Sequence, residues 1–237
     1  IDALPERDRK HIRIVDGIEP SYPTPLKKTP ASRPVIVGAG CAGLFAALTL
    51  AEAGLKPLLI ERGDDAHRRT DTISTFLDGG ALDPESNIQF GLGGAGTFSD
   101  GKLNTGTKNP SHRLILKTFV DAGAPRDILW DAKPHVGSDI LPAVVTNIAA
   151  RIEELGGSVR YRTKLVDIDL DRTDAVSGIR VTSAQPGAGG TSQELIRCNR
   201  LILACGHSAH DVFELIKRRE IELARKTFAM GVRIEHL

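Results

Sequence analysis

Aromatic side chains are scarce in this 237-residue chain, at 4%, and its positive and negative charges almost cancel to a net charge of +1. A protein that binds nucleic acid usually has a basic surface and often stacks bases on aromatic rings. Neither feature is present, so nucleic acid is not an expected partner.

Long apolar runs and paired cysteines are also missing. The longest uncharged apolar stretch, from Ala42 to Ala51, is too short for a membrane span, and the first ten residues contain no signal-peptide core. Cys41, Cys198 and Cys205 form no CxxC pair, which argues against a disulfide framework and against a cysteine zinc site. We therefore expect a cytoplasmic protein without membrane spans or a metal centre.

The strongest motif follows a proline-rich start and reads PVIVGAGCAGLFAALTLAEAGLKPLLIERG. A buried strand at 35–37 leads into a GxGxxG turn and then a helix that reaches Ala53. The first glycine permits the turn, the second lets a pyrophosphate approach the backbone, and the third lets the helix pack against the strand. Free N–H groups at the helix N-terminus favour phosphate. The cofactor-binding residues predicted in this turn are Gly38, Ala39, Gly40, Ala42 and Gly43.

An acidic residue, Glu61, ends the second predicted strand, 57–60, as expected of the ribose-binding acid in this motif. A carboxylate accepts a hydrogen bond from a free ribose hydroxyl and repels a 2′-phosphate, so NADP is disfavoured while NAD and FAD both remain. Arg62 is included among the cofactor-binding candidates. Arg62, Arg68 and Arg69 could pair with pyrophosphate, but we expect at least two of them to lie in a solvated basic loop.

Strand–helix alternation is then interrupted, unlike in a simple NAD dehydrogenase. A glycine-rich stretch, QFGLGGAGTFSDGKL, precedes predicted helices at 111–123 and 138–157. Three β-rich runs follow at 158–170, 175–184 and 193–206, the last with a buried segment from Leu201 to Ala204. We predict an α/β fold: a Rossmann-like FAD-binding domain with a parallel sheet, a β-meander and a helical insertion, as in the glutathione reductase superfamily.

Longer motifs add a resemblance. QFGLGGAGTFSDGKLNTGTK, KPHVGSDILPAVVTNI, ACGHSAHDVFELI and FAMGVRIEH resemble a family of largely uncharacterised bacterial FAD-dependent dehydrogenases over residues 34–236. The resemblance implies bound FAD and the flavin-enzyme fold, but no substrate. Cys41 and Leu92 depart from it, since the family usually has Pro and Glu there. Family members continue past VRIEH, so the chain looks truncated before a second, substrate domain.

The predicted boundaries follow from these patterns. They are a proline-rich arm at 1–33, the first part of the FAD-binding domain at 34–107, the helical insertion at 108–157, the second part of the FAD-binding domain at 158–215, and the start of a substrate domain at 216–237.

In the fold implied by the resemblance, the glycine-rich stretch lies along the flavin side of the cofactor. Its glycines would let backbone N–H groups approach the cofactor, and its hydroxyl and acidic side chains would bind ribityl and phosphate oxygens. Lys102 would neutralise phosphate or stabilise a reduced flavin, and a solvated position is its alternative. The candidates here are Gly93, Gly94, Gly96, Thr97, Ser99, Asp100 and Lys102.

Three further positions complete the predicted site. The strand at 163–168 resembles the family's adenine-side strand, where the backbone of Leu165 would contact the adenine edge. Gly206 would let the chain pass close to the cofactor, with an ordinary turn as the alternative. His135 and His207, on loops that the family places near the flavin, are weak catalytic candidates together with Lys102.

The function expected is an FAD-dependent oxidoreductase that moves a hydride through flavin N5, with an unidentified small-molecule substrate or electron donor such as NAD(P)H. The alternatives are a non-catalytic flavin-binding module or incomplete fragment, and an NAD-binding dehydrogenase domain.

Overall fold

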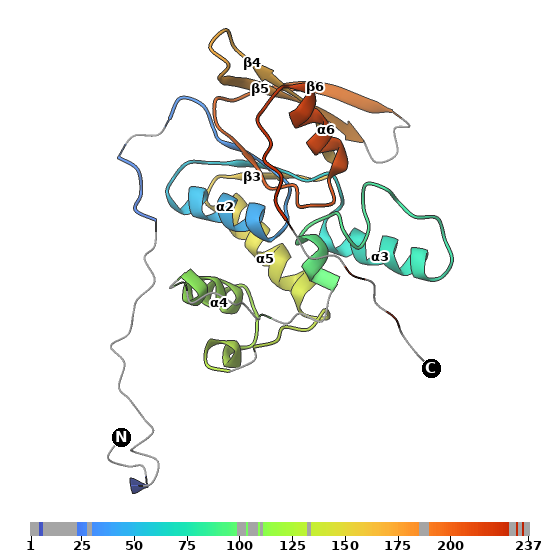
Figure 1. Ribbon diagram of the computed structural model, residues 1–237. Helices are drawn as coiled ribbons and strands as arrows, with labels where there is room; N and C mark the ends of the chain where they lie inside the picture. The colour runs from blue at the N-terminus through green and yellow to red at the C-terminus, as the bar shows by residue number, and fades with distance from the viewer. Residues whose placement is uncertain are drawn as a thin grey trace.

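The structure is a computed structural model that describes residues 5–6, 23–27, 30–98, 103, 109, 111–131, 134–184, 190–227, 231 and 234. Figure 1 shows the layers of the molecule: an antiparallel sheet above, a parallel sheet in the middle, and helices below. This arrangement is the Rossmann-like α/β fold with a β-meander that the sequence predicts.

The parallel sheet has four strands in the order β3-β2-β1-β7. They are β1 (Val35–Val37), β2 (Leu58–Ile60), β3 (Ser158–Arg160) and β7 (Leu201–Leu203). Helix α2 (Cys41–Glu52) connects β1 to β2, and helix α5 (Leu141–Glu154) leads into β3. Strands β2 and β3 therefore lie on one side of β1, and β7 lies on the other. The strand order reverses between β1 and β7, and open α/β sheets bind ligands at the carboxyl ends of the strands at such a position.

Strands β1 and β2 are covered on both faces, and successive side chains on each strand point to opposite faces. Ile36 and Leu59 pack with α2 and α5, whereas Val35, Val37 and Ile60 pack with the antiparallel sheet. That second sheet consists of β4 (Thr163–Leu170), β5 (Val176–Ala184) and β6 (Thr191–Arg197) in sequence order.

The β-rich run at 158–170 divides between the two sheets. Strand β3 pairs in parallel with β2, and β4 pairs antiparallel with β5. The chain turns between them at Tyr161 and Arg162, where Arg162 has a φ of +49°. Because the chain turns here, one β-rich run supplies a strand to each of the two sheets.

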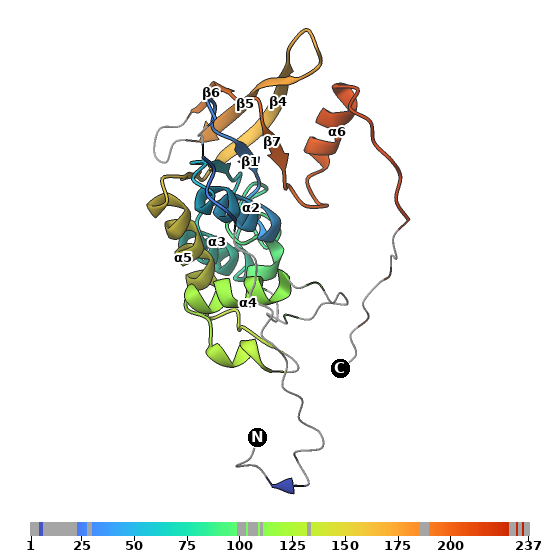
Figure 2. The ribbon, with the colours of Figure 1, turned by 90° about the vertical axis from the view of Figure 1, so that its left-hand side faces the viewer.

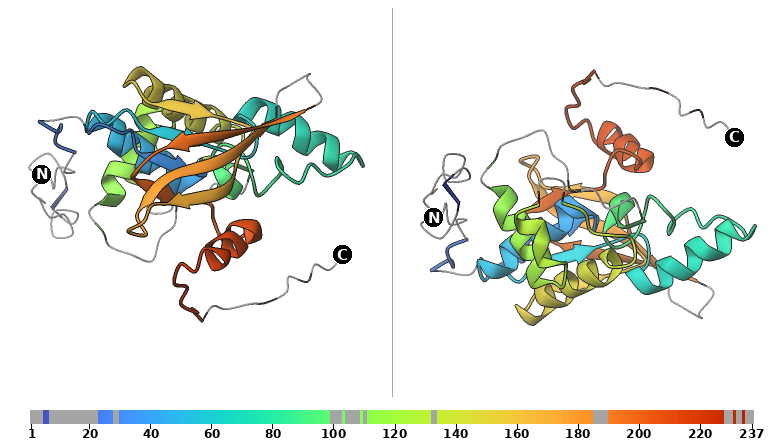
Figure 3. Two further views of the ribbon diagram at one scale, coloured as in Figure 1. Left: turned by 90° about the horizontal axis from the view of Figure 1, so that it is seen from above. Right: turned by 90° about the horizontal axis from the view of Figure 1, so that it is seen from below.

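The remaining helices are α3 (Ala66–Leu77), α4 (Ser111–Asp121) and α6 (His210–Arg218), with short 3₁₀ turns η1 (Gly94–Phe98) and η2 (Arg126–Leu129). Helices α4 and α5 agree with the predicted positions. Helix α3 was not predicted. Figures 2 and 3 show α6 on the flank of the molecule, beside β7 and away from α4 and α5.

The prediction that residues 201–204 are buried was wrong, because Leu201 and Ala204 are only half-buried and the two residues between them are exposed. Strand β7 lies at one end of the described sheet, and Ile202 and Leu203 are 38% and 37% exposed. Within the described residues, no helix has both the length and the apolar character needed to cross a membrane.

Candidate nucleotide-binding site

A cleft of about 460 Å³ lies at the carboxyl ends of β1 and β7. Four segments form its walls: the turn after β1, the glycine-rich loop, the segment after β7, and one side of α6. The lining residues include Gly38, Gly40, Cys41, Ala42, Glu61, Gln89, Phe90, Gly91, Gly93, Gly94, Gly96, Cys205, Gly206, His207, Val212 and Phe213.

The turn after β1 needs glycine at two positions because the backbone packs closely there. Gly38 has a φ of +100°, and a Cβ on it would lie 2.5 Å from the carbonyl oxygen of Ala204. A Cβ on Gly43 would lie 1.7 Å from the carbonyl oxygen of Gly38, so this glycine lets α2 approach the strand as predicted. Gly40 differs, since a Cβ there would meet only the Cα of Gly94, at 3.8 Å.

Helix α2 begins at the cleft. Its N-cap is Gly40, which supplies no side-chain cap, and Cys41 and Ala42 of its first turn line the cleft. The first N–H groups of a helix have no partner within the helix, and the helix dipole adds partial positive charge at this end. The arrangement therefore suits a phosphate group.

The glycine-rich loop packs directly against this turn. Gly93 N–H donates to the carbonyl oxygen of Ala39 at 2.8 Å, and Gly94 N–H donates to that of Gly91 at 2.9 Å. Gly93, Gly94 and Gly96 line the cleft, but the first two have N–H groups already bound within the protein. The expectation that these N–H groups bind the cofactor does not fit this arrangement. The two glycine loops instead need bare backbone to approach each other.

Of the remaining loop candidates, Thr97 belongs to the described residues, and it does not line the cleft. Thr97 is 2% exposed and its hydroxyl donates to the carbonyl oxygen of Leu92 at 3.4 Å, so it faces the interior of the loop. The predicted contact between Thr97 and ribityl or phosphate oxygens is corrected by this placement. Ser99, Asp100 and Lys102 lie outside the described residues.

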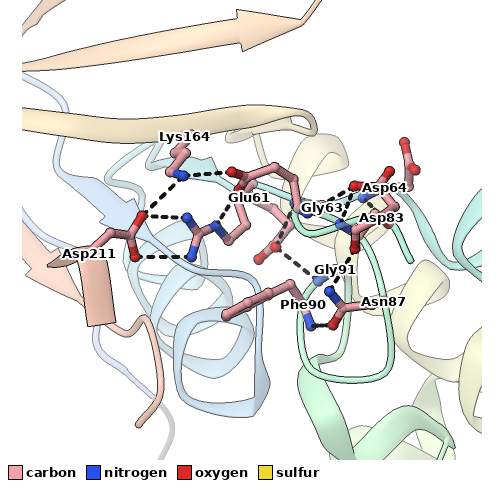
Figure 4. Close-up of polar contacts among 12 residues, drawn as sticks. Glu61, Gly63, Asp64, Asp83, Asn87, Phe90, Gly91, Lys164 and Asp211 are labelled. Atoms are coloured by element: carbon pink, nitrogen blue, oxygen red, sulfur yellow. Dashed lines mark hydrogen bonds and ion pairs between the residues drawn. The ribbon is translucent and has the colours of Figure 1, made fainter. Parts of the chain in front are cut away.

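Glu61 joins three loops around the cleft, and Figure 4 shows its contacts with two of them, at Gly63 and Gly91. One carboxylate oxygen accepts the Ala39 N–H at 2.7 Å, and the other accepts those of Gly63 and Gly91 at 2.9 and 3.0 Å. The residue is 4% exposed and lines both the cleft and a smaller cavity beside it. A carboxylate has about four acceptor positions, so one position remains for a ligand hydroxyl.

The smaller cavity, of about 40 Å³, lies between the end of β2, strand β4 and α6. Leu165 lines it, at the position where the sequence predicts the adenine contact. Leu165 pairs with Val181 on β5, and β4 is the terminal strand of the described antiparallel sheet, so its other edge has no strand partner in that sheet.

Side chains of opposite charge contact one another beside this cavity (Figure 4). Arg62 Nε bonds Glu85 at 2.8 Å, and its Nη1 bonds Asp211 at 3.2 Å. Lys164 Nζ lies 2.6 Å from Glu85 and 3.2 Å from Asp211. The Arg62 guanidinium also lies 4.5 Å from the centre of the Phe90 ring. Arg62 is therefore fixed at the cavity by two carboxylates.

At least two of the three arginines were expected in a solvated loop, but only one of them is solvated. Arg62 is only 14% exposed at its side chain, and Arg69 is completely buried. Arg68, with a side chain 61% exposed, agrees with the prediction. The sequence did not identify Asp211 or Lys164, because a partner that arrives from a distant element gives no local pattern.

The two histidines that were catalytic candidates lie in different parts of the structure. His207 lines the cleft and is exposed, whereas His135 is exposed elsewhere and does not line it. Gly206 has a φ of +74° and also lines the cleft. Burial, with Glu61 nearby, raises the pKa of Cys205 to about 11, so this thiol at the cleft stays protonated at neutral pH.

Known proteins are similar to this chain in sequence or in fold. An uncharacterized protein from Clostridium beijerinckii is 45% identical over 86% of this chain, and the match covers 36% of that protein. A thiamine thiazole synthase from Aeropyrum pernix is 27% identical over 90% of this chain and 68% of its own length. The crystal structure of THI4 from Thermovibrio ammonificans shares the fold, with a TM-score of 0.50 and 19% identity over 81% of this chain and 64% of that one.

The chain thus spans about a third of the Clostridium relative. The family model for pyridine nucleotide-disulphide oxidoreductases matches residues 32–226, which include every element of the cleft described above. The chain belongs to the pyridine nucleotide-disulphide oxidoreductase family, a family of FAD-dependent oxidoreductases, as its sequence motifs predict.

Proposed function

We propose that the cleft holds FAD for two-electron oxidation and reduction of a small molecule. The observation that carries this proposal is the N-terminus of α2, which has no side-chain cap and opens into the cleft at the carboxyl ends of β1 and β7, with Glu61 beside it. Helix N-termini at such positions bind phosphate, and an acid after the second strand binds ribose. Bound there, FAD would supply hydride transfer through its N5 atom.

The chain's residues have distinct tasks in this proposal. Gly40 leaves room for the pyrophosphate against the first turn of α2, because no side chain covers the backbone there. The remaining acceptor position of Glu61 receives a ribose hydroxyl. The adenine lies toward the smaller cavity, where Leu165 and Arg62 are lining residues.

The opposite part of the cleft receives the flavin in this proposal. The glycine-rich loop and the segment after β7 form its walls, and α6 adds the apolar side chains of Val212 and Phe213. A largely apolar wall with few polar groups excludes water from the reacting atoms. His207 is the residue at the cleft that can hold or move a proton near the ring.

Redox titration tests the proposal. Purified protein loaded with FAD is reduced anaerobically by dithionite or light, and then by NADH or NADPH in a stopped-flow instrument, with free FAD as the control. An oxidoreductase binds the flavin and cycles it between oxidised and two-electron-reduced forms.

Three outcomes distinguish the alternatives. Bound flavin that a nicotinamide reduces rapidly and saturably shows that the electron-donor site is complete in this chain. Bound flavin that a nicotinamide reduces no faster than free FAD indicates that this chain alone does not accept hydride from a nicotinamide. Absence of flavin binding, together with binding of NAD, contradicts the proposal and supports an NAD-binding domain. The substrate and electron donor of the whole protein remain part of the proposal, since the chain spans only part of its relative.

A further inference from the structure

A buried cation lies directly behind the wall of the cleft. Arg69, on α3, is 0% exposed, and its guanidinium donates three hydrogen bonds, each 2.8 Å long, to the carbonyl oxygens of Asn87, Ile88 and Leu92. Its plane lies over the Phe98 ring, 4.8 Å from the ring centre. No ion pair among the described residues includes Arg69.

Burying a charge without an ion pair is unfavourable unless hydrogen bonds replace its hydration. Burial accordingly lowers the pKa of Arg69 to about 10, which still leaves the group cationic at neutral pH. The three carbonyls that replace water belong to one loop, residues 87–92. A planar guanidinium can reach three acceptors at fixed angles, which a lysine ammonium cannot do in the same geometry.

The same loop is the part of the wall that faces the nucleotide. Gln89, Phe90 and Gly91 line the cleft. From the other side, Gly91 N–H donates to Glu61, and Leu92 N–H donates to the carbonyl oxygen of Asp64 at 3.0 Å. The loop is therefore held between Arg69 and the acidic side of the site.

Close packing supports this arrangement. Gly91 has a φ of +121°, and a Cβ on it would lie 2.4 Å from Cδ of Arg69. The loop thus rests on the stem of this side chain as well as on its guanidinium. Any change in the Arg69 side chain transmits directly to Gly91.

Charge gives Arg69 a second role. Among the described residues that line the cleft, none is a lysine or an arginine, although a pyrophosphate carries negative charge. A buried cation in surroundings of low dielectric interacts over longer distances than one in water. Arg69 is one loop away from the proposed cofactor.

We propose that Arg69 is a positioning residue for the cofactor: it fixes the loop 87–92 as the wall of the cleft and places a positive charge behind that wall. The inference rests on the proposed function, because it assigns the cleft to an anionic dinucleotide. Its role is indirect, since Arg69 acts on the ligand through the loop.

The test compares Arg69→Met, which removes the charge and the hydrogen bonds, with Arg69→Lys, which keeps the charge. Arg68→Met is the matched control on the same helix, because the Arg68 side chain is 61% exposed. FAD affinity is measured by flavin fluorescence well below the unfolding temperature. Amide hydrogen exchange is measured without ligand at Gly91–Gly93, with Val35–Val37 as an internal reference for global stability.

Arg69→Met should weaken FAD binding by roughly tenfold to a hundredfold, the usual effect of losing hydrogen bonds to a charged group. Its amides at Gly91–Gly93 should exchange faster relative to those at Val35–Val37. Arg69→Lys should restore part of the affinity, and Arg68→Met should match the unaltered chain.

A folded Arg69→Met chain with unchanged FAD affinity would overturn the inference, as would equal acceleration of exchange at the loop and at the reference strand. If Arg69→Met does not fold, Arg69→Lys decides the matter, because full affinity in that variant would show that the three-acceptor geometry is unnecessary. If the unaltered chain binds no FAD, the proposed function fails, whereas the exchange comparison still tests whether Arg69 holds the loop.

Discussion

Ala39 donates its backbone N–H to the Glu61 carboxylate at 2.7 Å, across 22 residues of sequence. Both residues lie within the core of the site, at 0% and 4% exposure. Together with the bonds from Gly63 and Gly91, this contact makes Glu61 the point at which three loops of the cleft meet. Glu61 thus has a structural role in addition to its proposed role in ribose binding.

Substitution of Glu61 should therefore reduce stability as well as FAD affinity. Glu61→Ala leaves three buried N–H donors without an acceptor, which should cost roughly 3 to 6 kcal/mol of the free energy of unfolding. Glu61→Gln keeps one oxygen and should cost less. Urea unfolding measures both values, and an unchanged midpoint for Glu61→Ala would contradict the contacts described here.

Two glycines of the GxGxxG motif should respond differently to substitution by alanine. Gly43→Ala places a Cβ 1.7 Å from a carbonyl oxygen and should destabilise the chain by at least about 3 kcal/mol. Gly40→Ala meets only an ordinary contact at 3.8 Å, so the free chain should keep its stability.

FAD affinity then tests the role of Gly40. If a pyrophosphate lies against this residue, Gly40→Ala should be a stable protein that has lost FAD. Calorimetric unfolding and equilibrium dialysis on the same sample provide both values. Full retention of FAD by Gly40→Ala would show that the cofactor does not approach the turn.

The two glycine loops and Glu61 are recognisable in the sequence because close approach and ribose binding demand particular residue types at fixed spacing. The complete burial of Arg69 was not recognisable in the sequence. Helix α3 buries Ala66, Arg69 and Ile73, but an arginine in a helix is expected on the solvent-facing side, so the buried face could not be recognised from the sequence. The Asp65 side chain caps this helix by accepting the Arg68 N–H. The exposure of β7 could not be predicted either, because a short apolar run does not indicate whether the strand lies at the edge or in the centre of its sheet.

Acid should weaken the attachment of α6. Arg219 hydrogen-bonds Asp167 on β4 and thereby lowers the pKa of that carboxyl. A carboxyl with a lowered folded-state pKa stabilises the fold fully above its unfolded pKa of about 3.9 and loses this contribution as pH falls through the folded value.

Asp167→Asn should accordingly lower the free energy of unfolding by about 0.5 to 1 kcal/mol at pH 6, since the pair is partly solvated. The difference between variant and unaltered chain should shrink toward zero near pH 3. Urea unfolding at the two pH values measures it, and an equal difference at both would show that the ion pair contributes nothing.

The two loop histidines form a matched pair for the chemistry. His207 lines the cleft and His135 does not. With NADH or NADPH as the donor, His207→Asn should slow flavin reduction, whereas His135→Asn should leave the rate unchanged. Loss of a general acid or base reduces a rate by roughly a hundredfold or more. Stopped-flow reduction of both variants at equal flavin occupancy measures the difference. Equal rates for the two variants would remove His207 from the mechanism.

Binding of FAD by the cleft at the carboxyl ends of β1 and β7 can be measured directly on the purified chain. The protein is incubated with FAD, freed of excess flavin by gel filtration, and its visible spectrum is recorded before mass analysis of what denaturation releases. We expect one FAD per chain, with a spectrum distinct from that of free flavin, and loss of both in Gly40→Ala. A colourless protein, with all FAD in the low-molecular-weight fractions, would show that the cleft does not bind FAD.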